Sequence, residues 1–313
     1  MPQETVFVGV DVSKGTLEIG EVGARSWPAP NDPGGWKKLI GWLRKLGRLV
    51  VVGVEPSGGY ERGLVKALQQ AGVEVRWCDP ARVRALAKAL GAPAKTDAID
   101  VGMIARFLAQ TGGRPIQADD ERDALKAALA ARRAAQDTAR RLEAQAQALP
   151  EGSAREALEA LATHAREAER ELTRQALRLV RESSALGDRW RRLQTAPGIG
   201  PLVAAELVAH MPELGAVSGK AIAKLAGLAP FIRKSGAWAG KAVCSGGRPI
   251  PRQMLYLATI ASLRARNGAR PLYEHFIGHG KPPKLALTAC MRRLLVTLNA
   301  MIRDASDWKA AEA

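Results

Sequence analysis

The sequence predicts an α/β domain followed by a mostly helical remainder, and three observations predict it. Short β-branched runs alternate with helical segments over the first 115 residues. The composition then changes to Ala, Glu, Arg, Gln and Leu, with few Gly or Pro, as far as residue 190. The last third is helical again, apart from one stretch rich in Gly and Lys. We therefore expect three parts, 1–115, 116–190 and 191–313.

The first part begins with a predicted hairpin. Residues 6–12 and 16–19 are apolar and β-branched, with a turn between them, and a third short strand near Trp27 ends at the prolines that follow. The next elements are a helix ending near Gly47, a buried strand over 49–54, a helix over 60–71, a strand over 73–77 and a helix opened by Asp79-Pro80. This order predicts a mixed sheet, begun by antiparallel strands and continued by crossover units.

The second part predicts a long pair of helices. Apolar and small residues alternate spacings of three and four, as in the seam of a coiled coil. The predicted seam is Leu158, Leu161, Ala165, Ala168, Leu172, Gln175 and Leu179. Two interpretations stay open: a dimerisation arm or spacer, and a helical insert packed on its own domain.

The third part carries most of the positive charge. Residues 191–313 hold 18 basic and 6 acidic side chains, a net charge of +12, within a chain total of +16. Such a surface favours polyanions. A turn between two predicted helices contains Pro197, Gly198 and Gly200, and its backbone amides suit a nucleic-acid phosphate. The alternative is an ordinary helix–helix turn, so we predict a helix-hairpin-helix-like contact mainly because of the regional charge.

Composition excludes several classes of protein. A hydrophobic fraction of 47% excludes a disordered polycation. The three cysteines are far apart and form no Cys-x-x-Cys pair, so neither a disulfide framework nor a zinc site is expected. We find no apolar run of the roughly 18 residues that a membrane helix needs, and the N-terminus does not resemble a signal peptide. We expect a cytoplasmic protein with no membrane partner.

Four acids are candidate metal ligands. Asp11 and Glu55 follow apolar strands, and Asp97 and Asp100 fall on one face of a predicted first helical turn. Each acid alone is more simply a turn residue or a favourable charge near a helix N-terminus. Together, however, carboxylates at the ends of neighbouring strands and on one helix provide the oxygen donors of a two-magnesium site. We predict that the four converge.

The stretch from Arg233 to Arg252 predicts a long irregular loop with a function. Its basic residues are Arg233, Lys234, Lys241, Arg248 and Arg252, which we predict to contact nucleic acid. Ser235 and Ser245 lie among them, and either hydroxyl could attack a phosphate in this cationic setting. A loop serine is also a common hydrogen-bonding residue.

At this point the sequence resembles a known family. The motifs are Val8-Gly-Val-Asp11, Glu55-Pro-Ser-Gly-Gly-Tyr60, Lys95-Thr-Asp97-Ala-Ile-Asp100, Gly227-Leu-Ala-Pro-Phe and Lys234-Ser235-Gly236. In this order they resemble the bacterial insertion-sequence transposases of the Asp-Glu-Asp-Asp type, the 110/1111 group. The resemblance covers nearly the whole chain.

The resemblance implies a ribonuclease-H-like first domain of the RuvC type, a coiled-coil arm and a basic C-terminal domain. It further implies that Mg²⁺, or Mn²⁺ in its place, is held by the four acids, and that Ser235 is the catalytic nucleophile. Lys234 departs from the acid that is common before this serine. Implied partners are donor and target DNA, a structured non-coding bridge RNA, and further copies of the chain in a dimer or tetramer. Residues alone would have indicated only a metal-dependent nucleic-acid enzyme.

Other functions remain as alternatives. A RuvC-like Holliday-junction or structure-specific nuclease would use the same acids. A non-catalytic nucleic-acid scaffold would bind equally well without them. An actin-like or sugar-kinase-like ATPase is disfavoured, because no second Asp-containing hairpin follows residue 110 and no Gly-Lys-Ser run occurs.

Overall fold

The structure is a computed structural model that describes residues 5–91, 97–116, 119–231, 234–235, 238–239, 243–244, 246–265 and 267–309, with the backbone alone at 97–100, 231, 234–235, 238–239 and 243. Contacts within the chain separate two compact units, residues 1–118 and 119–313. Each unit is described by itself. The division of the second unit into an arm and a terminal domain stays a prediction.

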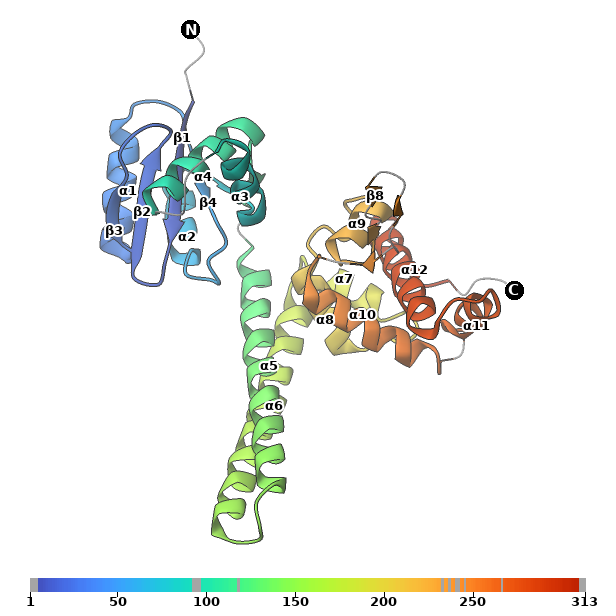
Figure 1. The fold of residues 1–313 in the computed structure, drawn as a ribbon. Helices are drawn as coiled ribbons and strands as arrows, with labels where there is room; N and C mark the ends of the chain where they lie inside the picture. Colours follow the sequence, from blue (N-terminus) through green and yellow to red (C-terminus); the bar gives the residue numbers. More distant parts are fainter. Residues whose placement is uncertain are drawn as a thin grey trace. The chain divides into compact units, whose positions relative to one another are not determined.

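The first unit contains a six-stranded sheet in the order β3-β2-β1-β4-β5-β6 (Figure 1). The strands are β1 (Val6–Val12), β2 (Thr16–Glu21), β3 (Trp27–Pro30), β4 (Val50–Val54), β5 (Glu74–Trp77) and β6 (Arg114–Pro115). The first three pair antiparallel, β4 and β5 continue parallel to β1, and β6 pairs antiparallel to β5. The predicted mixed sheet is confirmed.

Helices cover both faces of this sheet. They are α1 (Pro33–Lys45), α2 (Arg62–Gln70), α3 (Pro80–Ala89) and α4 (Asp97–Thr111). Alternate residues of β1, among them Val8 and Val10, are buried against α1 and α2. The opposite face packs against α3 and α4, whose Ile104 and Leu108 are buried there. Asp11 therefore belongs to the face of the sheet that α4 covers.

Three glycines let α4 lie directly on the sheet. Gly9 of β1 pairs with Gly20 of β2 and with Gly53 of β4, so the three form one row across neighbouring strands. A Cβ atom on Gly9 would lie 2.2 Å from the carbonyl oxygen of Val101, and one on Gly20 would lie 3.0 Å from the Val101 side chain. The start of α4 is thus fixed above β1 and β2.

Two local predictions in the first unit were wrong. The expected short strand at Trp27 is present as β3, but Pro28 and Pro30 lie within it and do not break it, which is tolerated because β3 is an edge strand. The short strand β6 was not predicted, since two residues carry no periodic signal. The three cysteines are free, as expected.

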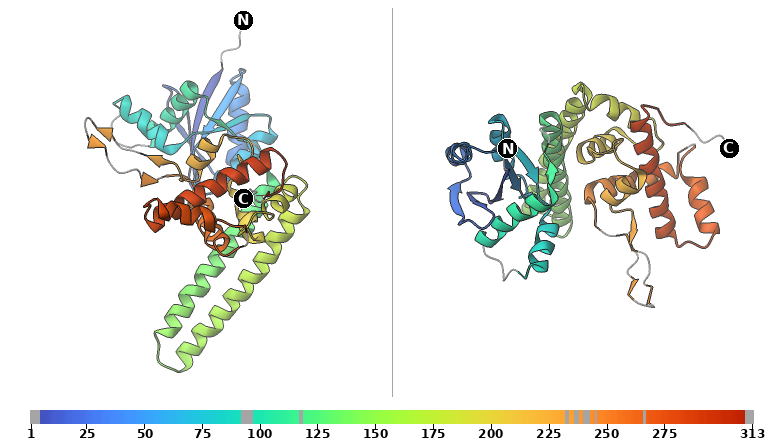
Figure 2. Two further views of the ribbon diagram at one scale, coloured as in Figure 1. Left: turned by 90° about the vertical axis from the view of Figure 1, so that its right-hand side faces the viewer. Right: turned by 90° about the horizontal axis from the view of Figure 1, so that it is seen from above.

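Helices dominate the second unit. They are α5 (Asp120–Gln147), α6 (Ser153–Glu182), α7 (Gly187–Leu193), α8 (Pro201–His210), α9 (Gly219–Leu225), α10 (Pro249–Ser262), α11 (Arg270–Gly278) and α12 (Pro283–Arg303). The long helices α5 and α6 run side by side as a hairpin, as Figure 1 and the left view of Figure 2 show. We call this pair the arm.

The seam of the arm differs from the predicted one at alternate positions. Leu161 is 55% exposed, whereas Ala162 and Ala176 are buried. Glu169 lies between them, one heptad from each, and pairs with Arg132 of α5 at 2.9 Å. The prediction failed because it followed hydrophobicity, while small alanines and a paired glutamate occupy these contact positions.

The base of the arm is part of the core of the second unit. Leu125 and Leu129 of α5 and Val180 of α6 are buried in one cluster with residues of α8, α10 and α12. Arg122 of α5 donates a hydrogen bond to the Val208 carbonyl of α8. The insert interpretation therefore holds for the base, and dimerisation through the rest of the arm stays a prediction.

The stretch predicted as an irregular loop contains short paired strands. β7 (Pro230–Phe231) pairs antiparallel with β10 (Val243–Cys244), and β8 (Lys234–Ser235) with β9 (Trp238–Ala239). Below them the backbones of Gly227 and Gly247 cross closely, since a Cβ on Gly247 would lie 2.1 Å from the Gly227 nitrogen. The loop prediction was wrong because strands of two residues leave no pattern in the sequence.

The helix α12 is an apolar segment that our search of the sequence for membrane helices did not find. Its 21 residues are long and apolar enough to cross a membrane by length and composition. Yet Leu295 and Leu298 are buried in the core of the second unit. Nothing further about a membrane follows from this helix.

Candidate active site

Asp11 and Glu55 occupy matching places on neighbouring strands. β1 and β4 are parallel, with Val10 opposite Val54, so the residues that follow, Asp11 and Glu55, come next to each other where these strands end. Gly9 and Gly53, two residues earlier, face α4, and the alternation of strands gives both acids that face. Both acids are half-buried. The sequence-based pairing of these two acids is supported by the register.

The other two acids lie in the first turn of α4. The helix begins at Asp97, so Asp97 and Asp100 are both in that turn, and Val101 follows directly above Gly9. The structure thus brings the backbone of Asp100 to the same side of the sheet as Asp11. The residues expected to cap this helix, Lys95 and Thr96, lie outside the described residues, as do the side-chain positions of both acids.

Electrostatics identify a neighbour of Glu55. Cys78 follows β5 directly, and its pKa is raised to about 12 by burial and by the nearby charge of Glu55. The thiol is therefore neutral and unsuited to nucleophilic attack. Among the side chains that the structure describes, no group of three or more His, Cys, Asp or Glu is arranged to hold a metal ion. Convergence of all four acids stays a prediction.

Two acids near the site were missed by sequence reasoning. Glu18 of β2 pairs directly with Asp11. Glu61 is 6% exposed and accepts hydrogen bonds from the Ser57 hydroxyl at 2.6 Å and the Gly59 amide at 2.9 Å. Burial would raise the pKa of Glu61, but these hydrogen bonds outweigh burial and the pKa lies below its ordinary value.

The loop after Glu55 has a different purpose from the one we predicted. Consecutive glycines after a buried strand, as at 58 and 59, indicate from sequence a close approach of a backbone or ligand. A Cβ on Gly58 would meet nothing within 4 Å, and Gly58 and Gly59 have φ of 77° and 111°. The glycines supply left-handed backbone that wraps the loop around the Glu61 carboxylate. The role of Glu61 is visible only in these hydrogen bonds, which join it to Ser57 and Gly59.

Ser235 lies in the second unit, within β8. Its residue partner in the pairing is Trp238 of β9, so Ser235 is at the turn end of this ladder. Lys234 precedes it in the same strand. Arg233, Lys241 and Ser245 lie outside the described residues.

The predicted phosphate-binding turn is built largely by packing. Gly198 has φ of 85°, and a Cβ there would lie 2.3 Å from the Ala258 carbonyl oxygen of α10. Gly198 is thus required for contact with α10. Gly200 is the N-cap of α8 and a Cβ there would meet nothing within 4 Å, while Pro197 is half-buried. Contact of this turn with a phosphate stays a prediction.

Comparisons with known proteins identify the family. Residues 8–153 match a family described as "Transposase", of the DEDD and IS110 type, and residues 190–274 match the "Transposase IS116/IS110/IS902 family". The chain belongs to the IS110 family of insertion-sequence transposases. It is an enzyme that acts on DNA.

Relatives of this transposase include proteins that span nearly its full length. The pilin gene-inverting proteins of Moraxella bovis and Moraxella lacunata are each 26% identical over 321 residues, which cover 95% of this chain and 96% of theirs. The IS116 44.8 kDa protein of Streptomyces clavuligerus is 32% identical over 133 residues, covering 41% of this chain and 32% of its own. The structure of T. thermophilus RuvC with a Holliday junction aligns with a TM-score of 0.28 and 18% identity, covering 36% of this chain and 100% of RuvC.

Two predicted nucleic-acid contacts of the transposase are engaged within the protein. Arg248 donates to both carboxylate oxygens of Glu213, at 2.6 and 2.7 Å, and to the His210 carbonyl oxygen at 2.8 Å. Arg252 donates to the Gly246 carbonyl oxygen at 2.9 Å. The Arg248 bonds tie the start of α10 to the C-terminal end of α8 and to Glu213, whereas the Arg252 bond is local; the sequence did not indicate the first role because Glu213 lies 35 residues from Arg248.

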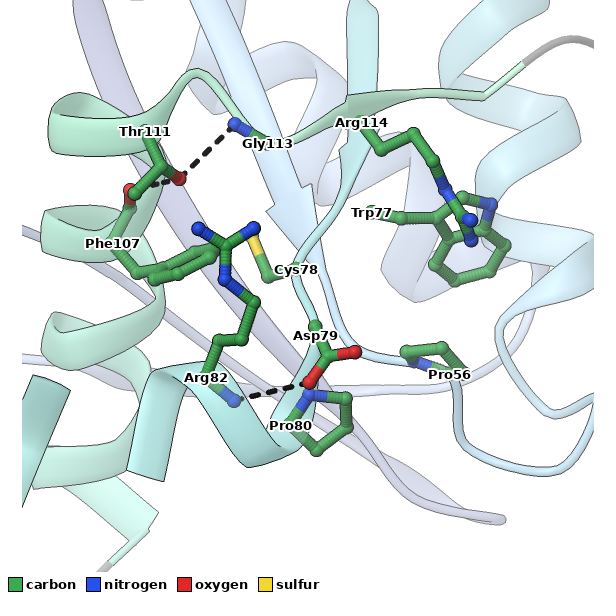
Figure 3. Close-up of a pocket in the computed structure, with 10 residues that line it drawn as sticks. All are labelled: Pro56, Trp77, Cys78, Asp79, Pro80, Arg82, Phe107, Thr111, Gly113 and Arg114. Atoms are coloured by element: carbon green, nitrogen blue, oxygen red, sulfur yellow. Dashed lines mark hydrogen bonds between the residues drawn. The ribbon is translucent and has the colours of Figure 1, made fainter. Parts of the chain in front are cut away.

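A cavity of about 210 Å³ opens beside Glu55 in the first unit (Figure 3). Its lining residues are Pro56, Trp77, Cys78, Asp79, Pro80, Arg82, Phe107, Thr111, Gly113 and Arg114. They come from the ends of β4 and β5, from α3, from the end of α4 and from β6. No pattern in the sequence indicates this cavity, since its lining residues come from five separate segments.

Proposed function

We propose that this transposase cleaves and rejoins DNA strands at a site formed by Asp11, Glu55, Asp97 and Asp100, with Ser235 as the nucleophile. The observation that carries the proposal is the position of Asp11 and Glu55, side by side on the face covered by α4. The first turn of α4, which holds the other two acids, directly precedes Val101, which lies over Gly9 of β1 and Gly20 of β2.

The donor chemistry of the acids fits a divalent metal. Carboxylate oxygens are the hard ligands that Mg²⁺ prefers, and Mn²⁺ accepts them as well. Asp11, Glu55, Asp97 and Asp100 would hold the metal. When bound, it would polarise the scissile phosphate and offset the negative charge that develops there. The four carboxylates themselves would keep the metal at the ends of β1 and β4.

Ser235 would carry the strand between cleavage and rejoining. Its Oγ forms a bond to phosphorus while the bond from phosphorus to the sugar oxygen breaks; a carboxylate of the acidic site accepts the hydroxyl proton, and the released sugar oxygen takes up a proton from water. The phosphoserine bond retains the free energy of the broken linkage. A sugar hydroxyl of the new partner strand then displaces Ser235, so rejoining needs no further energy source.

The positive charge of the protein indicates its nucleic-acid partners, and the number of DNA strands exchanged indicates that several subunits act together. The excess of basic residues in 191–313 supports binding of donor and target DNA and of a structured bridge RNA. Exchange between two duplexes requires several active sites, so the enzyme would act in the cytoplasm as a dimer or tetramer. Ser235 of one subunit would then complete the acidic site of another.

The decisive experiment searches for the covalent intermediate. Purified protein is incubated with Mg²⁺, cognate DNA and RNA transcribed from the DNA that flanks its gene, and a denaturing gel resolves protein–DNA adducts. We expect an adduct in the wild type and in Ser245→Ala, and none in Ser235→Ala or Glu55→Gln. An adduct that persists in Ser235→Ala overturns the nucleophile, and strand cleavage without any adduct supports a RuvC-like nuclease instead.

The assignment in trans has its own test. Asp11→Ala and Ser235→Ala subunits are each inactive alone under this proposal. Mixed before addition of DNA, they should regain activity, because each supplies the group that the other lacks. A mixture that stays inactive while the subunits still associate would contradict action in trans.

A further inference from the structure

We propose that the cavity beside Glu55 binds one unpaired nucleotide of the DNA strand on which the reaction takes place. The inference deepens the proposed function and rests on it, because it takes Glu55 as part of the reaction centre. It concerns residues that neither the acidic motif nor the family resemblance includes: Trp77, Arg82, Phe107 and Arg114.

The cavity lies next to the proposed reaction centre. Pro56, which lines it, follows Glu55 directly, and Cys78, which also lines it, lies close enough to feel the charge of Glu55. The cavity is thus lined by the residue that directly follows the acid in the chain. In open α/β sheets, ligands bind outside the carboxyl ends of the strands, and this cavity lies where β4 and β5 end. A DNA strand with its phosphate at Glu55 would bring an adjacent nucleotide here.

The walls of the cavity contain aromatic and arginine side chains. The Arg82 guanidinium lies 5.3 Å from the centroid of the Phe107 ring, and since Phe107 is 4% exposed, the exposed Arg82 provides the accessible surface there. Arg114 of β6 is paired with Trp77 of β5, so the side chains of these two residues lie on the same face of the sheet (Figure 3). Aromatic rings and guanidinium planes are the surfaces on which unpaired bases stack, and guanidinium groups also bind phosphate oxygens.

Charge and size favour a single nucleotide. Asp79 is the one acid in the lining as the structure describes it, and its Oδ1 already accepts hydrogen bonds from the amides of Ala81 and Arg82, at 2.9 and 3.0 Å. Two arginines against this engaged carboxylate favour an anion. A volume of about 210 Å³ is below the roughly 300–1,000 Å³ of sites for larger ligands. One base fits such a space, and a paired duplex does not.

Cross-linking tests the proposal without cleavage. The full-length protein is mixed in EDTA with an oligothymidylate that carries 4-thiothymidine throughout, irradiated, digested and analysed by mass spectrometry. We expect adducts on peptides that contain Trp77 or Phe107. Base stacking worth about 1–3 kcal/mol per base corresponds to a change of roughly 5- to 150-fold. The double variant Arg82→Ala/Arg114→Ala should therefore lose these adducts at least about 5-fold.

Matched controls separate the cavity from general charge. Arg84 is on α3 with Arg82 and is also exposed, but it does not line the cavity. Arg84→Ala should change the cavity adducts less than about 2-fold, and adducts in residues 191–313 should stay constant in all variants. Both substituted arginines are exposed, and an unchanged thermal unfolding midpoint verifies the fold.

Three results would overturn the proposal. They are the absence of cavity adducts in the wild type, equal adducts in the double variant, and adducts that form only with 4-thiouridine RNA. Its failure is distinguishable from that of the proposed function. Asp11→Ala should abolish cleavage and leave the cross-link, whereas cleavage that survives in Glu55→Gln refutes the acidic site whatever the cross-link shows.

Discussion

The two units of this transposase hold their acids in place by different means. In the first unit, strand register and a row of glycines under α4 set the positions of Asp11 and Glu55. In the second, buried acids are held by arginines, as Glu206 is by Arg133 at 2.6 and 2.7 Å. Close packing depends on shape and ion pairs depend on charge. The positions of these acids should therefore be sensitive to added volume in the first unit and to lost charge in the second.

Gly9→Val should produce the largest effect. Its Cβ would lie 2.2 Å from a backbone carbonyl that cannot move without displacing α4. We expect the free energy of unfolding to fall by about 3 kcal/mol or more, with loss of DNA cleavage. Urea denaturation measures the first and the adduct assay the second. Gly41→Ala, within α1 and open to space, is the control and should raise stability by about 0.5–1 kcal/mol.

Among the substitutions that remove a charge, Glu206→Gln should have the largest effect on stability. Glu206 is fully buried, Arg133 donates two bonds to it, and the Nε2 atom of His210 lies 3.4 Å away. Arg133 retains some solvent contact, so we expect a loss of about 2 kcal/mol in the free energy of unfolding. Glu159→Gln breaks an exposed pair with Arg155 and should cost less than about 0.5 kcal/mol. Equal losses in the two variants would contradict the larger contribution of the buried ion pair in the second unit.

The effect of Glu206 should depend on pH. Burial raises its pKa, but hydrogen bonds and charges from His210 and Arg133 outweigh burial and hold the pKa below the ordinary value of 4.5. A lowered pKa stabilises the fold above 4.5, and that contribution disappears as the pH falls through the folded-state value. Unfolding curves of the wild type and Glu206→Gln should therefore converge in this acidic range. A constant difference down to the lowest pH at which the protein folds would show that charge is not the cause.

Arg248→Ala should have a smaller effect. It removes two hydrogen bonds to Glu213 and one to His210, and with both side chains partly exposed we expect a loss of about 1 kcal/mol. If Arg248 contacts phosphate instead, stability stays constant and the salt dependence of DNA binding becomes shallower. Measuring both quantities decides between these roles, with Arg252→Ala as the comparison.

Leu161→Ala should have the smallest effect. Leu161 is 55% exposed although the sequence predicts it in the seam, so its truncation should change the free energy of unfolding by less than about 0.5 kcal/mol. Ala162→Leu, one position along, inserts volume into the contact between α5 and α6 and should cost about 1–3 kcal/mol. The opposite ranking would restore the predicted seam.

Much of the first unit could be predicted because its signals are local. Alternation in residues 6–12, the buried run at 49–54 and the Asp79-Pro80 helix start each act within a few residues, and all three elements are present. The same signals put Asp11 and Glu55 at strand ends. They could not find β6, Glu18 as the partner of Asp11, or the cavity, since these depend on which strands become neighbours.

The sequence by itself determined the element order of the first unit, the surplus of charge in residues 191–313 and the motifs that identify the family. Only the tertiary structure decided that Gly198 packs against α10, that Arg248 pairs with Glu213, and that Ala162 replaces Leu161 in the arm. The physical reason is the distance along the chain between the residues that interact. Periodicity and turn chemistry act between near neighbours in the chain, whereas close packing and ion pairing join residues that only folding brings together.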